Sequence, residues 1–280
     1  MKRVIVLLTG IFMGFTSLAQ TDSTKNEGDT IRIGAMIIIK KPGKDGDERD
    51  RRETRIYYRR HHDYKPSNIS TNWIIIDLGF TNYNDKTNYS SAAIQDPVTG
   101  FAPGANKDWF KLRAIKSVNV NFWLFMQRIN LVKHVVNLKY GLGVELNNYR
   151  YDEPIKYKVN PTQVIMDNST TYKKNKLAAD YVTAPIMLNF NFTPKKRDPF
   201  GLSVGVSAGY LYSSRQKTIT DADGKRKKRD DFDLKPWKVS YIGEITLGPV
   251  KLYGSYATQS IFEKGLDQTP YNFGIRLSNW

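Results

Sequence analysis

The sequence predicts an all-β protein: an eight-stranded antiparallel up-and-down transmembrane β-barrel with a mostly disordered N-terminal periplasmic extension. Two observations predict it. From Asn72 onward, eight stretches alternate apolar and polar residues, which is the period of a β-strand with two different faces. The links between these stretches alternate between long and short, as they do in barrels that cross a membrane.

The first residues are typical of a signal peptide. Lys2 and Arg3 precede an apolar run at 4–15 that is too short for a helical membrane span. Ser17-Leu18-Ala19 forms a small-x-small cleavage site, so we expect residues 1–19 to be removed and the protein to be exported. The chain has no cysteine, which excludes disulfides and thiolate metal sites.

Residues 20–71 are expected to form a charged periplasmic extension or linker ahead of the barrel at 72–280. Residues 31–39 are β-prone and predict one short strand, whereas residues 40–65 are dominated by charge and bury little. His61 and His62 could bind a metal, but adjacent residues of an extended chain point to opposite sides. A solvated linker is therefore the favoured interpretation.

The eight candidate strands follow in order, each with one apolar and one polar row. They lie near residues 74–81, 118–127, 136–147, 182–192, 201–210, 237–246, 251–262 and 271–278. The third is the clearest, whereas Trp123 and Phe125 fall in the polar row of the second and weaken its pattern. A parallel α/β sheet would instead give continuous apolar runs separated by amphipathic helices.

The links sort by length. Long links are expected at 84–111, 152–176, 216–234 and 263–270, and short ones at 130–134, 193–199 and 248–249. In an antiparallel barrel alternate links lie at opposite ends, so all long links share one end and the termini share the other. Outer-membrane barrels have short periplasmic turns and long external loops, which predicts periplasmic termini.

The polar row is expected to face inward. It is rich in Gly and Ser, notably at 201–209, and a narrow lumen needs small residues. It also carries both signs of charge, which predicts a lumen charge network, since a buried charge needs a partner. The predicted members are Asp77, Lys139, Glu145, Lys238, Glu244 and Arg276. Eight strands enclose a lumen that side chains fill, so an open pore is not expected. The alternative is a soluble ligand-binding barrel with its apolar row inside.

The formal charge of +16 could indicate nucleic-acid binding. The basic residues are clustered locally, however, and an exported chain meets phosphorylated lipid first. We therefore expect outer-membrane lipid and lipopolysaccharide as partners, and no nucleic acid. A candidate external basic patch consists of Lys225, Arg226, Lys227, Lys228 and Arg229. The alternative is a hairpin tip at Asp223-Gly224 with a solvated basic flank.

Three short motifs support a family resemblance: Ser17-Leu18-Ala19-Gln20, the stretch 181–188 with Pro185 in mid-strand, and the final strand 271–277. Together with the strand layout, they resemble the PorT-like outer-membrane β-barrel family of Gram-negative bacteria, an architectural relative of OmpA-like barrels. The resemblance covers residues 72–280 and implies no catalytic residues and, for some members, a link to secretion. The terminal Trp280 is similar to the aromatic ending read by barrel-assembly machinery, although it falls in phase with Arg276.

No catalytic set stands out in the sequence. Of the three histidines, His61 and His62 precede the barrel and His134 falls in a short turn, so no Ser-His site is expected at the external rim. The external links do carry carboxylates, at Asp85, Asp108, Asp152 and Glu153.

We therefore expect a non-enzymatic outer-membrane barrel of the broad porin class, structural, adhesive or secretion-associated, with no cofactor or metal. Residues 20–71 could bind a secretion or envelope protein. The alternatives are an outer-membrane enzyme acting on lipid A or peptides, and a binder of lipopolysaccharide or other acidic polymers through basic loops.

Overall fold

The computed structural model describes residues 29–33, 36–40, 54–58, 66–196, 199–248 and 250–278. The chain divides into two units, residues 1–63 and 64–280, which are described separately. The predicted signal peptide, the His61-His62 pair and Trp280 lie outside the described residues. Within those residues, no helix is long and apolar enough to cross a membrane.

The first unit contains a small antiparallel sheet of three strands in the order β1-β2-β3. Strand β1 spans Asp29–Ile33, β2 spans Met36–Lys40 and β3 spans Thr54–Tyr58. The single strand expected over residues 31–39 is thus two paired strands, with Ile33 opposite Met36. The charged stretch supplies the third strand, in which the consecutive residues Ile56, Tyr57 and Tyr58 favour β-structure.

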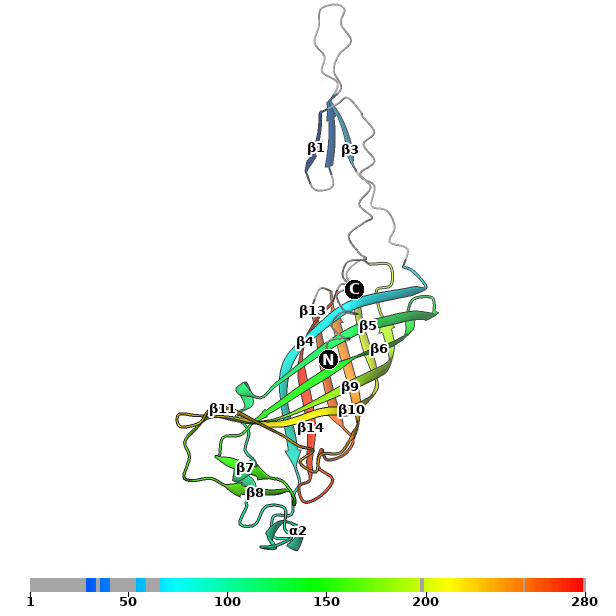
Figure 1. Ribbon diagram of the computed structural model, residues 1–280. Coiled ribbons are helices and arrows are strands. Elements are labelled where there is room, and N and C mark those ends of the chain that lie inside the picture. Colours follow the sequence, from blue (N-terminus) through cyan, green and yellow to red (C-terminus); the bar gives the residue numbers. More distant parts are fainter. Residues whose placement is uncertain are drawn as a thin grey trace, which may run out of the picture. The chain divides into compact units, whose positions relative to one another are not determined.

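The second unit is a closed ring of eight antiparallel strands (Figure 1). The strands are β4 (Ile69–Asp85), β5 (Val118–Val132), β6 (Val136–Arg150), β9 (Tyr172–Asn191), β10 (Phe200–Thr220), β12 (Trp237–Leu247), β13 (Val250–Ala257) and β14 (Gln268–Leu277). Each pairs with its neighbour along the ring, and β14 returns to pair with β4. This confirms the predicted eight-stranded up-and-down barrel, with its first strand beginning at Ile69 rather than Asn72.

The remaining elements all lie in the long links. They are α2 (Ala92–Gln95), η2 (Lys107–Phe110), η3 (Ala114–Lys116), the hairpin of β7 (Ile155–Lys158) and β8 (Gln163–Met166), and β11 (Gly224–Arg229). Figure 1 shows α2, β7, β8 and β11 at one end of the ring. Strands β9 and β10 are longer than expected and take in parts of the links predicted at 152–176 and 216–234.

The wall of the barrel turns its apolar row outward. Along β9, Val182, Ile186 and Leu188 are 41–50% exposed, whereas Thr183 and Asn189 are buried. The alternation continues along β10 and β12. A barrel with an apolar exterior and a polar interior suits a lipid surrounding. It is the reverse of what a soluble ligand-binding barrel needs.

Strand β5 departs from the predicted alternation for an identifiable reason. Its pairing with β6 shifts register between Trp123 and Phe125, which marks a bulge. An extra residue in one strand changes the phase of its side chains. Trp123 and Met126 therefore both face inward, while Leu124 between them is exposed. Gln127, expected in the inward row, instead accepts a hydrogen bond from the outer-row Tyr140 hydroxyl.

Candidate functional site

The structure brings the six residues of the predicted lumen charge network together inside the ring. They come from four strands: Asp77 from β4, Lys139 and Glu145 from β6, Lys238 and Glu244 from β12, and Arg276 from β14. Each is at most 6% exposed. The strand alternation aims all six at the axis, so residues far apart in sequence meet across the lumen.

Arg276 is the centre of this network. Its Nε lies 2.7 Å from Asp77 Oδ1 and its Nη2 lies 2.8 Å from Asp77 Oδ2, while Nη1 donates to Glu244. A guanidinium that grips a carboxylate with two parallel hydrogen bonds fixes both distance and orientation. Trp123 Nε1 and Asn121 Nδ2 also donate to Asp77 Oδ2, at 2.7 and 3.1 Å, so this carboxylate has partners from β5 as well as from β14.

Two further ion pairs extend the network around the lumen. Lys139 pairs with Glu244, and Lys238 pairs with Glu145. Glu145 Oε1 also accepts hydrogen bonds from the side-chain amides of Asn147 and Asn272. The six predicted members thus carry three positive and three negative charges, and the buried Lys251 adds a further cation to the lumen. Pairing matters here because an uncompensated charge at this depth costs several kcal/mol.

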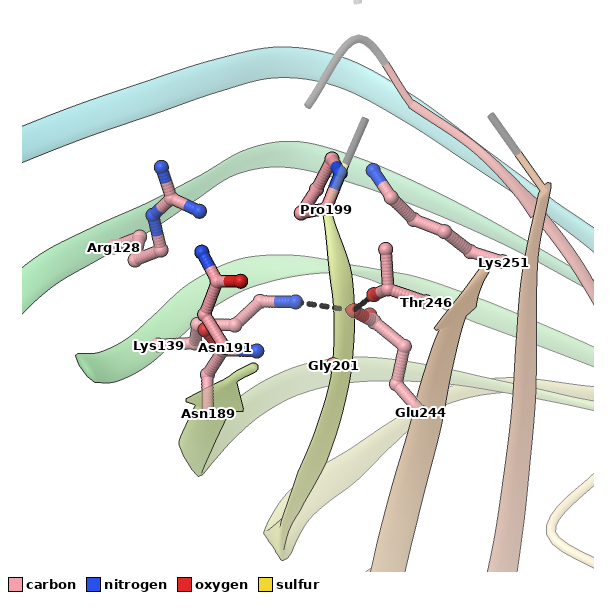
Figure 2. Close-up of a pocket in the computed structure, with 9 residues that line it drawn as sticks. All are labelled: Arg128, Lys139, Asn189, Asn191, Pro199, Gly201, Glu244, Thr246 and Lys251. Atoms are coloured by element: carbon pink, nitrogen blue, oxygen red, sulfur yellow. Dashed lines mark hydrogen bonds and ion pairs between the residues drawn. The ribbon is translucent and has the colours of Figure 1, made fainter. Parts of the chain in front are cut away.

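The network leaves little open space in the lumen. Figure 2 shows the Lys139–Glu244 pair bordered by Arg128 and Lys251, around a cavity of about 10 Å³. A second cavity beside Trp123 and Arg276 measures about 30 Å³. A single water needs roughly 10–15 Å³, so these two spaces have room for only one or two water molecules each.

An apolar cluster inside the ring was missed by the sequence analysis. Ile75, Trp123, Met126 and Met187 are all buried and pack together. These positions alternate with lipid-facing residues, as inward-facing positions should. Because their side chains are apolar, however, an alternation of apolar and polar residues does not identify them. Only the bulge in β5 brings Trp123 and Met126 onto the same side.

The long links were expected to be loops, but they build a second hydrophobic core. We call this the loop cap; it includes Ile94, Phe101, Phe110, Ile155, Tyr157, Val164, Phe232, Leu234, Ile261, Phe262 and Leu266, with Tyr151 just past β6 and with Tyr149 and Tyr181 from the strands below. All four long links contribute, and Tyr151 and Tyr157 share a hydrogen bond of 2.7 Å. The density of aromatic residues in these links was the available signal.

Two of the four carboxylates considered for catalysis, Asp152 and Asp85, are engaged in local structure. Asp152 lies 2.7 Å from Arg113 Nε, and Asp85 accepts hydrogen bonds from Tyr89 and Gln268. His134 occupies the turn between β5 and β6, and the described residues hold no group of three or more metal-ligating side chains.

The candidate basic patch is strand β11. All its residues are exposed, and it pairs with the distal part of β10 beyond a turn at Gly224, whose φ is +63°. Arg226 lies 2.7 Å from Asp223, and Lys228 donates to the Tyr157 carbonyl in the loop cap. The patch is thus a hairpin held against the cap at one point, with Lys225 and Lys227 on its other face.

Comparison with known proteins agrees with this architecture. No curated protein matches the chain. Residues 76–262, more than half of the sequence, match the family described as outer membrane protein beta-barrel domain. The matched span begins in β4 and extends into the last long link, so it covers most of the ring. The chain therefore belongs to the outer membrane protein beta-barrel domain family, and its place is the outer membrane.

Proposed function

We propose that this protein is a closed, non-enzymatic membrane anchor that presents the rigid loop cap to structural, adhesive or secretion-associated partners. The observation that carries the proposal is the lumen charge network, because ion pairs from four strands fill the interior where a channel would run. Function then belongs to the surfaces, and the loop cap, which has a buried hydrophobic core of its own, provides an ordered surface beyond the ring.

A PorT-like, secretion-associated role fits the two-unit organisation. The small sheet of β1, β2 and β3 precedes the ring and offers edges for a secretion or envelope protein partner. Barrel-assembly machinery is the expected partner during insertion. We do not extend the proposal to catalysis on lipid A or peptides, because Asp152 at the rim is paired with Arg113 and His134 lies at the opposite end.

Conductance across planar bilayers tests the closed state. The purified full chain should give no steady ionic current, whereas a wide porin reconstituted alongside gives discrete open steps. A variant with Lys139→Ala and Glu244→Ala removes the Lys139–Glu244 pair and the contact of Glu244 with Arg276. Arg276 stays paired with Asp77, and the variant should conduct measurably more. A steady current through the unmodified protein would contradict the proposal.

Crosslinking in native outer membranes tests the role of the cap. Photo-crosslinkers at exposed positions of the links that build the cap, such as Ile115, should capture a defined envelope or surface protein, while crosslinkers at lipid-facing Ile186 should capture none. Equal capture at both positions would argue against a cap-specific partner.

A further inference from the structure

Four cations form a row across four neighbouring strands beyond the apolar part of the wall. Arg150 of β6 lies opposite Lys176 of β9, Lys176 lies opposite Lys217 of β10, and Lys217 lies opposite Lys227 of β11. We call these residues the cation row. Strands are about 4.8 Å apart, so the row spans roughly 14 Å.

The cation row has the same orientation as the outward-facing row of the wall, from which the buried Ala178 and Asp180 separate it on β9. Arg150 belongs to the same row of β6 as the outward-facing Leu142, and Lys176 to the same row of β9 as Val182. The alternate residues Tyr149 and Leu177 point the other way, into the loop cap. The row is therefore on the membrane side of the sheet, not on the side that covers the lumen.

An aromatic pair lies between the apolar wall and the cation row. The rings of Tyr210 and Trp237 are 5.0 Å apart, and both side chains are about half exposed. Exposed Tyr and Trp residues gather at the headgroup level of a bilayer. Lys217 lies seven residues past Tyr210, roughly 23 Å along the tilted strand β10, so the row lies beyond the aromatic pair on the side of the loop cap. In Figure 1 the β10–β11 hairpin projects sideways beyond the ring.

Like charges directly opposite each other destabilise a sheet. Within the described residues, no ion pair involves any member of the cation row, although Lys176 donates to the Asn148 side chain. The nearby Asp180 pairs instead with Arg215. Burial, followed by the charges of Lys225, Lys174 and Lys227, lowers the pKa of Lys217. Bound anions would relieve this repulsion.

We propose that the cation row binds the phosphate groups of anionic lipids in the leaflet that surrounds the barrel. The inference rests on the proposed function in one respect, that the ring spans the membrane as an anchor. Clustered cations attract a phosphate surface, and a row of this length can contact more than one phosphate. Its position on the outer face of the sheet favours lipid over a soluble polyanion.

Spin-label lipid selectivity tests the proposal. The full chain is reconstituted in phosphatidylcholine vesicles that contain trace spin-labelled phosphatidic acid or spin-labelled phosphatidylcholine, and the protein-bound fraction of each is measured. We expect roughly fivefold preference for phosphatidic acid at low salt, falling as salt rises. The variant R150Q/K176Q/K217Q/K227Q should reduce the preference to near one.

A matched control removes the same charge elsewhere. The variant K86Q/K107Q/K116Q/K264Q changes four exposed lysines of the long links and should keep most of the preference. Equal loss in both variants would overturn the proposal, because it would show a general charge effect. An unchanged preference for phosphatidic acid in the cation-row variant would also overturn the proposal. The same holds if the cation row binds soluble polyphosphate and the protein shows no lipid preference. Heat-modifiable gel mobility verifies that each variant is folded. Bilayer conductance tests the closed-anchor proposal separately, so a failure of that proposal can be distinguished from a failure of the lipid-binding proposal.

Discussion

At the scale of the residue, ion pairing between charged side chains stabilises the interior of the barrel. Arg276 holds two carboxylates at once, and each has its own further partners. Removing one member of a buried pair leaves a charge in a place that cannot hydrate it, which costs more than the pair itself contributes. Keeping a partner for each buried charge is therefore more important than any single contact.

Arg276→Met should lower the free energy of unfolding by about 3–5 kcal/mol, because Asp77 and Glu244 lose their shared cation. Urea unfolding in lipid vesicles measures the change. The double variant R276M/D77N should recover part of the loss, since it removes one uncompensated charge. A cost below about 1 kcal/mol for Arg276→Met would show that the network tolerates an unpaired carboxylate.

Two glycines with opposite orientations give a second test. A Cβ at inward-facing Gly143 would lie 2.7 Å from the Cα of Trp123, whereas a Cβ at outward-facing Gly243 would meet nothing closer than 3.9 Å. Gly143→Ala should therefore destabilise the barrel by about 1–3 kcal/mol, and Gly243→Ala should be nearly neutral. The same urea unfolding measurement applies, and equal effects would contradict the close approach of β5 and β6.

At the scale of the element, the long links behave as parts of one folded layer. Phe110 of η2 is 1% exposed and packs against Tyr89 and Tyr151, which come from other segments of the cap. Strand β9 reaches into the same layer through Leu177. Because each link supplies some apolar residues but none could bury them alone, the cap forms only when the ring brings the links together.

Phe110→Ala should loosen the loop cap without opening the ring. Removing a buried phenylalanine costs about 3–5 kcal/mol, and here the cost falls on the cap. Limited proteolysis should therefore cut the links much faster, while heat-modifiable gel mobility stays that of a folded barrel. Ile115→Ala, at an 83% exposed position of η3, is the control and should leave the cleavage rate unchanged.

At the scale of the whole molecule, two layers with opposite chemistry are stacked along one ring. The wall exposes apolar side chains and encloses polar ones, and beyond it the cap encloses apolar side chains beneath a cationic outer face. This inversion places the change of solvent, from lipid to water, near Tyr210 and Trp237.

This orientation predicts that the hairpin of β10 and β11 is accessible from outside the cell. Trypsin added to intact cells should cleave within the basic stretch at 225–229, which is exposed throughout. A variant with all five cations replaced by glutamine should resist cleavage there. Cleavage only after the outer membrane is permeabilised would reverse the predicted topology.

The sequence by itself determined the strand number, the sorting of the links and the identity of the charges in the lumen, because strand alternation is a local property with a period of two. Tertiary structure decided which charges pair, since Asp77 and Arg276 are neighbours only through closure of the ring. It also decided the phase change in β5, the apolar cluster around Trp123 and the loop cap. The cation row likewise depends on registers between four strands, and a register is set by pairing partners rather than by any one strand.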